Sequence, residues 1–193
     1  ELSKEILKIN KNSIKNNNPT SRRSSINGII IQLPLPKHIK TSVILNAISP
    51  KKDIDALSSA KILRSKTKAD KKNPKVLAPT AEAVKFIFEK YKLKSDFKNP
   101  RSRTSKTILI VGRGQLVGKP IYNWLVSQNP YREIMVQHAV WQRKIKIIDI
   151  KEKSQLPKLA READIIISGV GKAGLIKGNM IKKNAVLVDF GFD

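Results

Sequence analysis

The chain has 193 residues and a hydrophobic content of 40%, which is enough to bury one large core or two smaller ones. Its apolar runs are far shorter than the roughly 20 residues of a membrane-spanning helix, so no span is expected. Cysteine is absent, which excludes disulfides and thiolate metal sites, and two histidines a hundred positions apart do not suggest a zinc site. We expect a soluble, cytoplasmic protein with no bound metal.

The formal net charge is +24, and a field of that sign attracts polyanions. Nucleic acid is therefore the first partner to consider. However, the lysines are scattered along the whole chain and aromatic residues make up only 5% of it. A basic stripe with interleaved stacking platforms is missing, so we favour a general Lys, Asn and Ile bias over a nucleic-acid footprint.

The first hundred residues predict a small α/β domain. Helical spacing of apolar residues marks 1–10 and 41–47, and the apolar run 28–31 predicts a short strand buried on both faces, ended by two prolines. Residues 49–55 read as a loop, 65–73 as a polar, Lys-rich stretch, and Thr80 as the N-cap of a further helix. Because the chain begins with glutamate and stops directly after an expected strand, we expect a fragment that lacks both ends.

From residue 106 onward, short strands alternate with helices. Strands are expected at 107–111, 145–150, 165–168 and 185–190, with helices at 121–126 and 154–163 between them. Continuous apolar strands separated by amphipathic helices predict a doubly wound, mostly parallel Rossmann-like sheet. We place the boundary near 99–105, giving domains 1–100 and 101–193, and treat 130–143 as an insertion of unassigned conformation.

A glycine-rich turn follows the first of these strands. Gly112, Gly114 and Gly118 are spaced G-x-G-x-x-x-G, one residue longer than the common dinucleotide fingerprint, and they open a helix. Such a turn brings backbone amides and a helix N-terminus onto a phosphate, which Arg113 could also pair with. The alternative is a strand-to-helix turn that needs glycine only for packing, with Arg113 facing water.

The end of the next strand carries the residues that would select the cofactor. Asp149 occupies the position of the acid that binds the adenosine ribose, which would favour NAD. Lys151 and Lys153 follow and could instead bind the 2′-phosphate of NADP, and a solvated strand end remains a third interpretation. A second glycine-rich loop, 169–174, comes after the third strand, at the edge where ligands bind in such sheets.

Polar groups also occur in the first domain at positions typical of sites. Gln32 follows the apolar run, and Asp53 and Asp55 lie in the loop 49–55. Spacing alone does not make them catalytic, because Gln32 could be a satisfied strand-end amide and Asp53 a turn cap. His38 and His138 have no readable partners and are expected at the surface.

Five segments in order resemble the bifunctional methylenetetrahydrofolate dehydrogenase and methenyltetrahydrofolate cyclohydrolase family. Residues 28–36 are similar to its G-I-L-V-Q-L-P-L-P signature, 50–55 to its P-x-K-D-V-D-G loop, and 111–120 to its V-G-R-S-x-x-V-G-x-P turn. Residues 163–174 and 181–191 resemble its A-D-I-x-x-x-A-x-G-x-P-G and I-K-x-G-A-x-V-I-D-V-G segments. The resemblance covers nearly the whole chain from Gly28 onward, apart from the insertion 130–143 and the Lys-rich stretch 65–73.

The resemblance implies an enzyme that transfers hydride from methylenetetrahydrofolate to NADP, or to NAD, and then hydrates the methenyl product to formyltetrahydrofolate. By this resemblance Gln32 works with a catalytic lysine, Asp55 holds the pterin ring, and Ile31 and Leu33 flank the folate. The cofactor would be bound by Gly112, Arg113, Gly114, Lys151 and Phe192, the last near the nicotinamide. The resemblance also implies a homodimer.

The chain departs from the family pattern in several places. Gly114 replaces the serine of the cofactor turn, Ala56 replaces the glycine after Asp55, and 78–83 differ from the P-C-T-P-x-G segment. The family's Tyr-x-x-x-Lys pair would lie before Glu1 and its P-G-G-V-G loop after Asp193, so we expect the isolated chain to be catalytically inactive. A binding protein of the same fold, with its charge serving an RNA or ribosomal partner, is the alternative function.

Overall fold

The computed structural model describes residues 1–11, 26–59, 76–93, 106–128 and 144–191. The chain divides into two compact units, Glu1–Ala78 and Pro79–Asp193. This division precedes the boundary expected near 99–105, a stretch outside the described residues, because helix α4 (Pro79–Lys90) packs against α5 (Gly118–Ser127) of the second unit. None of the helices in the described part of the chain is long and apolar enough to cross a membrane.

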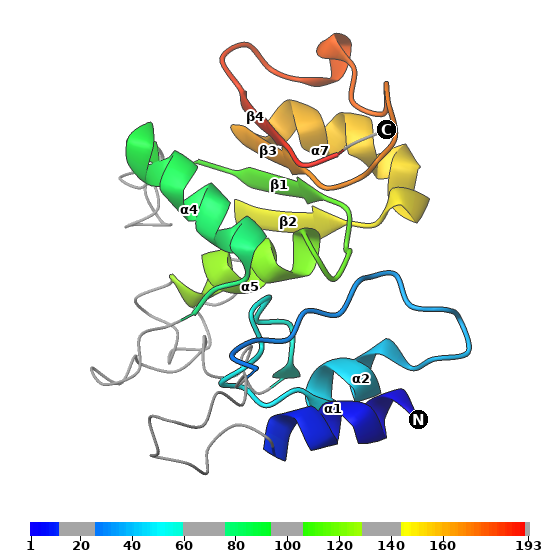
Figure 1. Cartoon of the computed structure of the whole chain (residues 1–193). Coiled ribbons are helices and arrows are strands. Elements are labelled where there is room, and N and C mark those ends of the chain that lie inside the picture. Colours follow the sequence, from blue (N-terminus) through cyan, green and yellow to red (C-terminus); the bar gives the residue numbers. More distant parts are fainter. Residues whose placement is uncertain (12–25, 60–75, 94–105, 129–143, 192–193) are drawn as a thin grey trace, which may run out of the picture. The chain divides into compact units, whose positions relative to one another are not determined.

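The first unit is built on two helices, α1 (Leu2–Lys11) and α2 (Thr41–Ala47), shown in Figure 1 in blue and cyan. Both helices lie where the apolar spacing predicted them. Ile6 of α1 packs with Ile44 and Ile48 at the end of α2, and Ile29 and Ile31 cover this cluster. The expected loop at 49–55 is confirmed.

Polar side chains tie the C-terminal end of α1 to the end of α2 and to the loop after it. The Asn10 amide donates to the carbonyl oxygen of Ala47 at 2.6 Å and accepts from the backbone N–H of Ser49 at 2.9 Å. Lys52, only 7% exposed, donates from Nζ to the carbonyl of Ile9 at 2.5 Å. The last turn of a helix leaves carbonyls without intrahelical partners, and a lysine there satisfies one of them.

The strand predicted at 28–31 is wrong. Only a single parallel bridge, Ile29 with Asp53, forms in this segment, with the N–H of Ile29 donating to the carbonyl of Lys52 at 2.7 Å. Ile30 is 60% exposed, so the run is not covered on both faces. One bridge to a loop fixes the position of the segment but does not extend into a ladder.

The second unit contains a four-stranded parallel sheet in the order β2-β1-β3-β4, as the sequence predicted for this domain (Figure 1). Its strands are β1 (Ile108–Val111), β2 (Ile145–Ile148), β3 (Ile165–Ser168) and β4 (Val186–Asp189). From β1 the chain passes to β2 on one side and then crosses to β3 on the other. The topological switch point therefore lies between the carboxyl ends of β1 and β3.

Helices cover both faces of this sheet. Leu109, Val111 and Ile166 pack with Leu156 and Ala160 of α7 (Leu156–Glu162), which follows the short 3-10 helix η2 (Ile150–Gln155). Side chains alternate along a strand, so the fully buried Ile108, Ile110, Ile165 and Ile167 face the other way, where α5 contacts β1 and β2. A second 3-10 helix, η3 (Gly178–Met180), leads into β4.

Thr80 is not the N-cap of α4, as predicted, but lies inside its first turn. The helix begins at Pro79, two residues earlier than an N-cap at Thr80 would give, because proline has no N–H to leave unpaired and its φ suits a helix start. The Thr80 hydroxyl donates instead to the carbonyl of Leu116 at 2.7 Å, in the turn before α5. The stretches 65–73 and 130–143, and with the latter His138, lie outside the described residues.

Candidate functional site

Two glycine-rich loops meet at the switch point of the sheet. Gly112 follows β1 with φ +104°, and a Cβ at this position would lie 2.9 Å from Val170 Cγ2 and 3.3 Å from the carbonyl oxygen of Gly169. Gly169 follows β3 and faces Val117, whose Cγ1 would be 2.5 Å from an added Cβ. Only glycine allows these loops to approach so closely at the edge where open α/β sheets bind their ligands.

The turn between β1 and α5 has one closed side and one open side. Gly118 packs so tightly against Gly112 that a Cβ would come within 1.8 Å of the Gly112 carbonyl oxygen, whereas a Cβ on Gly114 would meet nothing within 4 Å. Gly112 and Gly118 are thus needed for close packing, which is the role that the alternative interpretation gave to the glycines of this turn. Gly114 leaves free space over the turn. This combination fits a bound phosphate, which needs both a tight turn and room for close backbone approach.

Arg113 lies across the end of β2. Its Nη2 donates to the carbonyl of Ile147 at 2.9 Å and is 3.5 Å from Oε2 of Glu152 in η2. Asp149 caps η2: its carboxylate accepts from the N–H of Lys151 at 3.0 Å, and Glu152 accepts from the N–H of Asp149 at 3.0 Å. Arg113 is therefore held beside a carboxylate at the end of β2, with its side chain still partly exposed.

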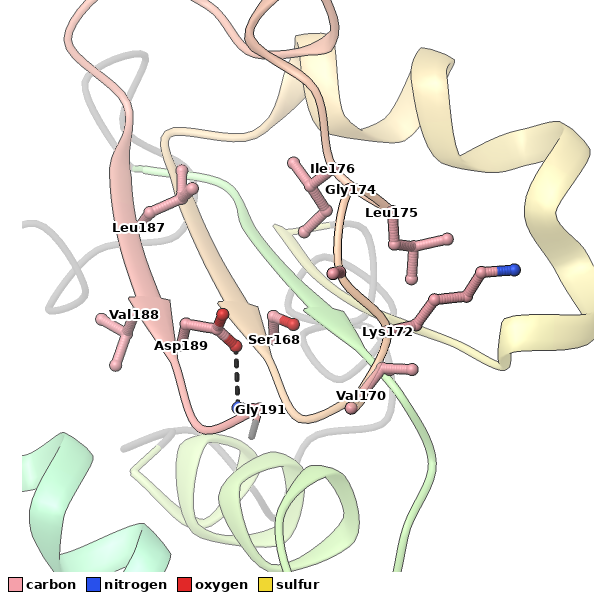
Figure 2. A pocket seen from close by; sticks show the side chains of 12 residues that line it. Ser168, Val170, Lys172, Gly174, Leu175, Ile176, Leu187, Val188, Asp189 and Gly191 are labelled. Carbon is pink, nitrogen blue, oxygen red and sulfur yellow. Dashed lines mark hydrogen bonds between the residues drawn. The ribbon is translucent and has the colours of Figure 1, made fainter. Parts of the chain in front are cut away.

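A hollow of about 210 Å³ lies between β4 and the loop after β3 (Figure 2). Ser168 and Asp189 place oxygen atoms at the two strand ends, and the Asp189 carboxylate accepts from the N–H of Gly191 at 2.9 Å. Lys172 also lines the hollow, and the rest of the lining is apolar or glycine, including Val170, Leu175, Ile176, Leu187 and Val188. The hollow thus combines apolar and polar surface in about equal parts, at the carboxyl edge of the sheet where open α/β folds bind their ligands.

In the first unit, the residues predicted to bind substrate lie on two adjoining segments. The bridge between Ile29 and Asp53 is parallel, so the segment leading to Gln32 and the segment leading to Asp55 run in the same direction from their point of contact. Gln32 is exposed and Leu33 half-buried, and the peptide bond between Leu33 and Pro34 is cis. Ile31 is half-buried because it packs against the core cluster.

Asp55 is electrostatically perturbed. Burial and then the charge of Asp53 raise the pKa of its carboxyl above the ordinary value. Asp53 is only 3% exposed and accepts from the N–H groups of Leu57 at 3.4 Å and Ser58 at 2.9 Å, which confirms its interpretation as a turn cap. A carboxyl with a raised pKa in a loop is a feature of functional sites, although structural clusters also produce it.

Some of the site was not visible in the sequence. The contacts of Glu152 and Thr80 with the region of the glycine turn were not predicted, although the spacing Asp149-x-x-Glu152 is that of a capping box and could have located the first of them. Lys151 is exposed, and Phe192 lies outside the described residues. Within the described ranges, no group of three or more His, Asp or Glu side chains is arranged to hold a metal ion.

Curated relatives and solved structures resemble this chain over most of its length. Bifunctional protein FolD of a Sulfurovum species is 33% identical over 168 residues, covering 87% of this chain and 50% of that protein. FolD of Nautilia profundicola is 34% identical, covering 88% of this chain and 50% of that protein. The chain spans about half the length of the curated relatives it matches.

Among solved structures, the bifunctional FolD enzyme of Campylobacter jejuni matches with a TM-score of 0.71 at 24% identity, covering all of this chain and 55% of that one. The bifunctional dehydrogenase/cyclohydrolase of Thermoplasma acidophilum matches with a TM-score of 0.67 at 25% identity, covering 98% of this chain and 55% of that one. The first of these likenesses bears on the fold alone, and it confirms the expected α/β architecture.

Family models match both units. Residues 3–55 match the catalytic domain of tetrahydrofolate dehydrogenase/cyclohydrolase, and residues 79–193 match its NAD(P)-binding domain. The second match covers more than half of the chain and begins at the first residue of the second compact unit. The chain therefore belongs to the tetrahydrofolate dehydrogenase/cyclohydrolase family.

Proposed function

We propose that this chain is the central part of an enzyme of one-carbon metabolism that oxidises methylenetetrahydrofolate to methenyltetrahydrofolate and hydrolyses the product to formyltetrahydrofolate. The observation that carries the proposal is the match of both units, in order, to the two domains of one enzyme family. The relatives named here are FolD proteins, and none of them favours the nucleic-acid alternative.

The second unit would bind the dinucleotide, with NADP as the first candidate and NAD as the other. A Trypanosoma brucei relative of this fold was solved with NADP, and a Saccharomyces cerevisiae relative is NAD-dependent. Gly112 and Gly114 would bring backbone groups to the cofactor phosphates, and the guanidinium of Arg113 and the ammonium of Lys151 would bind its anionic adenosine end. The bound nicotinamide would supply a hydride acceptor, while the chain would position it and exclude water.

The reacting end of the cofactor would occupy the hollow at the ends of β3 and β4. Aliphatic side chains such as Val170 and Leu187 could pack against an aromatic ring, and the oxygens of Ser168 and Asp189 could orient a carboxamide. Phe192, which follows the hollow's Gly191 by one residue, is proposed to lie beside the ring.

The first unit would bind the folate. Asp55 would accept from the N–H donors of the pterin ring, and Ile31 and Leu33 would flank it. Gln32 would position the catalytic lysine of the family's Tyr-x-x-x-Lys pair. Hydrolysis requires such a lysine to carry a proton. The raised pKa of Asp55 supports its proposed role in binding the pterin ring. Its carboxylate is costly to form without a partner, and a ligand that donates hydrogen bonds would stabilise the ionised form. We also propose that the protein is cytoplasmic and forms a homodimer. Light scattering of the purified protein tests the oligomeric state.

The test is oxidation of methylenetetrahydrofolate by the native protein that contains this chain, followed at the methenyl absorbance band with NADP and with NAD. Gln32→Ala and Asp55→Asn are each expected to lower the rate by about 10²-fold, the scale on which loss of one positioning or acid–base group acts. His38→Ala is the matched control, because His38 is exposed in the loop after Gln32 and has no proposed role.

Turnover that falls in the two site variants and not in the control supports the enzyme. Absence of turnover with both cofactors, from folded protein that also binds neither cofactor, would overturn the proposal. A salt-steep affinity for RNA in the same preparation would then favour the nucleic-acid alternative.

A further inference from the structure

Arg113 places its guanidinium at the end of β2, where it already pairs with a neighbouring carboxylate. The guanidinium is anchored by the carbonyl of Ile147 at 2.9 Å and lies 3.5 Å from Oε2 of Glu152. An arginine in this place is otherwise well suited to a phosphate, because its donors are rigid and permanently charged.

Glu152 is fixed in this position by the local backbone. Its Oε2 accepts from the N–H of Asp149 at 3.0 Å, and Asp149 in turn accepts from the N–H of Lys151 at 3.0 Å, which closes a reciprocal capping box. The Glu152 side chain is 35% exposed, so it is partly packed as well as hydrogen-bonded. Moving the carboxylate away from Arg113 would break the cap.

In a dinucleotide-binding fold, the adenosine ribose lies at the end of the second strand, where an acid favours NAD and a cation favours NADP. We propose that Glu152 is a specificity-determining residue that disfavours the 2′-phosphate of NADP and so shifts the chain toward NAD; this inference rests on the proposed dinucleotide site. A 2′-phosphate drawn to Arg113 would meet a fixed like charge, whereas the ribose hydroxyl of NAD would not.

Two exposed cations act in the opposite sense. Lys151 and Lys153 follow the same strand, and their ammonium groups attract a phosphate. Both side chains are long and solvent-exposed, so their attraction is screened by salt. Glu152 therefore lowers the affinity for NADP in a graded way and does not abolish it.

The experiment measures dissociation constants of NADP, NAD and 2′,5′-ADP by isothermal titration calorimetry for the native chain and for Glu152→Gln. Glutamine keeps an oxygen for the N–H of Asp149 and removes the charge. NADP and 2′,5′-ADP are expected to bind about five- to tenfold more tightly to the variant, with NAD changed less than about twofold. The matched control is Glu162→Gln, which removes the same charge from α7, where Glu162 pairs with Lys146 at 2.7 Å.

The inference is supported if Glu152→Gln changes the ratio of NADP to NAD affinity and Glu162→Gln does not. It is overturned if both cofactors gain equally, if the control has the same effect, or if NADP binds more weakly because Glu152 orients Arg113. If NAD binds but the ratio of NADP to NAD affinity is the same in the native protein and in Glu152→Gln, this inference alone is overturned. If none of the three ligands binds the native protein or the variant, the proposed cofactor site is overturned as well.

Discussion

Gly112 and Gly114 are two residues apart in one turn, yet the structure constrains them differently. Gly112→Ala would place a methyl group 2.9 Å from Val170 Cγ2 at φ +104°, so we expect it to lower the free energy of unfolding by about 2 kcal/mol. Gly114→Ser, which restores the family's residue in open space, should change it by less than about 0.5 kcal/mol. Urea unfolding monitored by circular dichroism measures both.

The pair also separates packing from ligand binding. If Gly114→Ser destabilises as much as Gly112→Ala does, the space over the turn is not open as described. If Gly114→Ser is stable and tightens NADP binding, the added hydroxyl reaches the phosphates.

Asp55 predicts a pH dependence of stability. Because its pKa is raised in the folded chain, the fold binds more protons at this group than the unfolded chain, and ionisation costs stability as pH rises above 3.8. Asp55→Asn should therefore raise the free energy of unfolding slightly at pH 7, by no more than about 0.5 kcal/mol. Urea titrations at pH 7 and pH 3.5 test this, since the gain should vanish at the lower pH; a loss of stability at pH 7 would contradict it.

Asp164 predicts the opposite dependence. Burial alone would raise its pKa, but hydrogen bonds from Lys182 and from the Thr107 backbone N–H outweigh burial and lower it. Its contribution to stability is therefore present above pH 3.8 and is lost as pH falls through the lower, folded value.

We expect Asp164→Ala to lower the free energy of unfolding by about 1–3 kcal/mol at neutral pH, because the N–H of Thr107 loses its partner at 2.7 Å. Lys182→Met keeps that bond and should cost less than about 1 kcal/mol, since the ion pair is partly exposed. Unfolding curves at pH 7 and pH 2.5 provide the measurement, and equal losses in the two variants would refute the assigned order.

At the scale of elements, apolar patterns predicted the helices and strands that bury a continuous apolar face. They did not predict whether a short apolar segment would find neighbouring strands to pair with. Strands β1 and β3 and helix α2 were found at or within one residue of their expected bounds, because each carries a continuous or helical apolar pattern. The run 28–31 has the same apolar character but forms a single bridge, since one loop is its partner among the described residues. Sequence does not show how many neighbours a short strand will find.

The candidate site shows the same division. Gly112, Arg113, Gly114, Gln32 and Asp55 were picked out because their motifs are read from residue order alone. The contact of Glu152 with Arg113 could not be predicted, because it joins two side chains across a turn at 3.5 Å. The roles of these residues stay predictions until binding and turnover are measured.

The attachment of α1 is an element-scale prediction. Asn10→Ala removes the hydrogen bonds to Ala47 and Ser49 at the end of α2, and we expect the free energy of unfolding of the first unit to fall by about 1–2 kcal/mol. The control is Lys8→Met, which removes an exposed pair with Glu5 on the same helix and should change stability by less than about 0.5 kcal/mol. Equal effects on the thermal unfolding of the two variants would rule out the assigned attachment.

For the whole molecule, the two compact units predict ligand-linked stability in only one of them. A dinucleotide at 100 times its dissociation constant stabilises the unit that binds it by about 2.7 kcal/mol. In scanning calorimetry, we expect the transition of Pro79–Asp193 to rise with cofactor while that of Glu1–Ala78 does not. Asn10→Ala should lower only the cofactor-insensitive transition, and one transition that shifts as a whole would show that the units unfold together.

The strand order also determines when this sheet can assemble. Ile108 of the inner strand β1 pairs with Ile145 on one side and with Ile165 on the other, so both neighbours of β1 are made after it during synthesis. A nascent chain that has just completed β1 holds four buried-type apolar residues with no partner strand, and every ladder must close across a helix or a long connection. The sheet of this unit can therefore form only late in synthesis. Until then its most apolar strand, β1, is exposed to misassociation for the longest time.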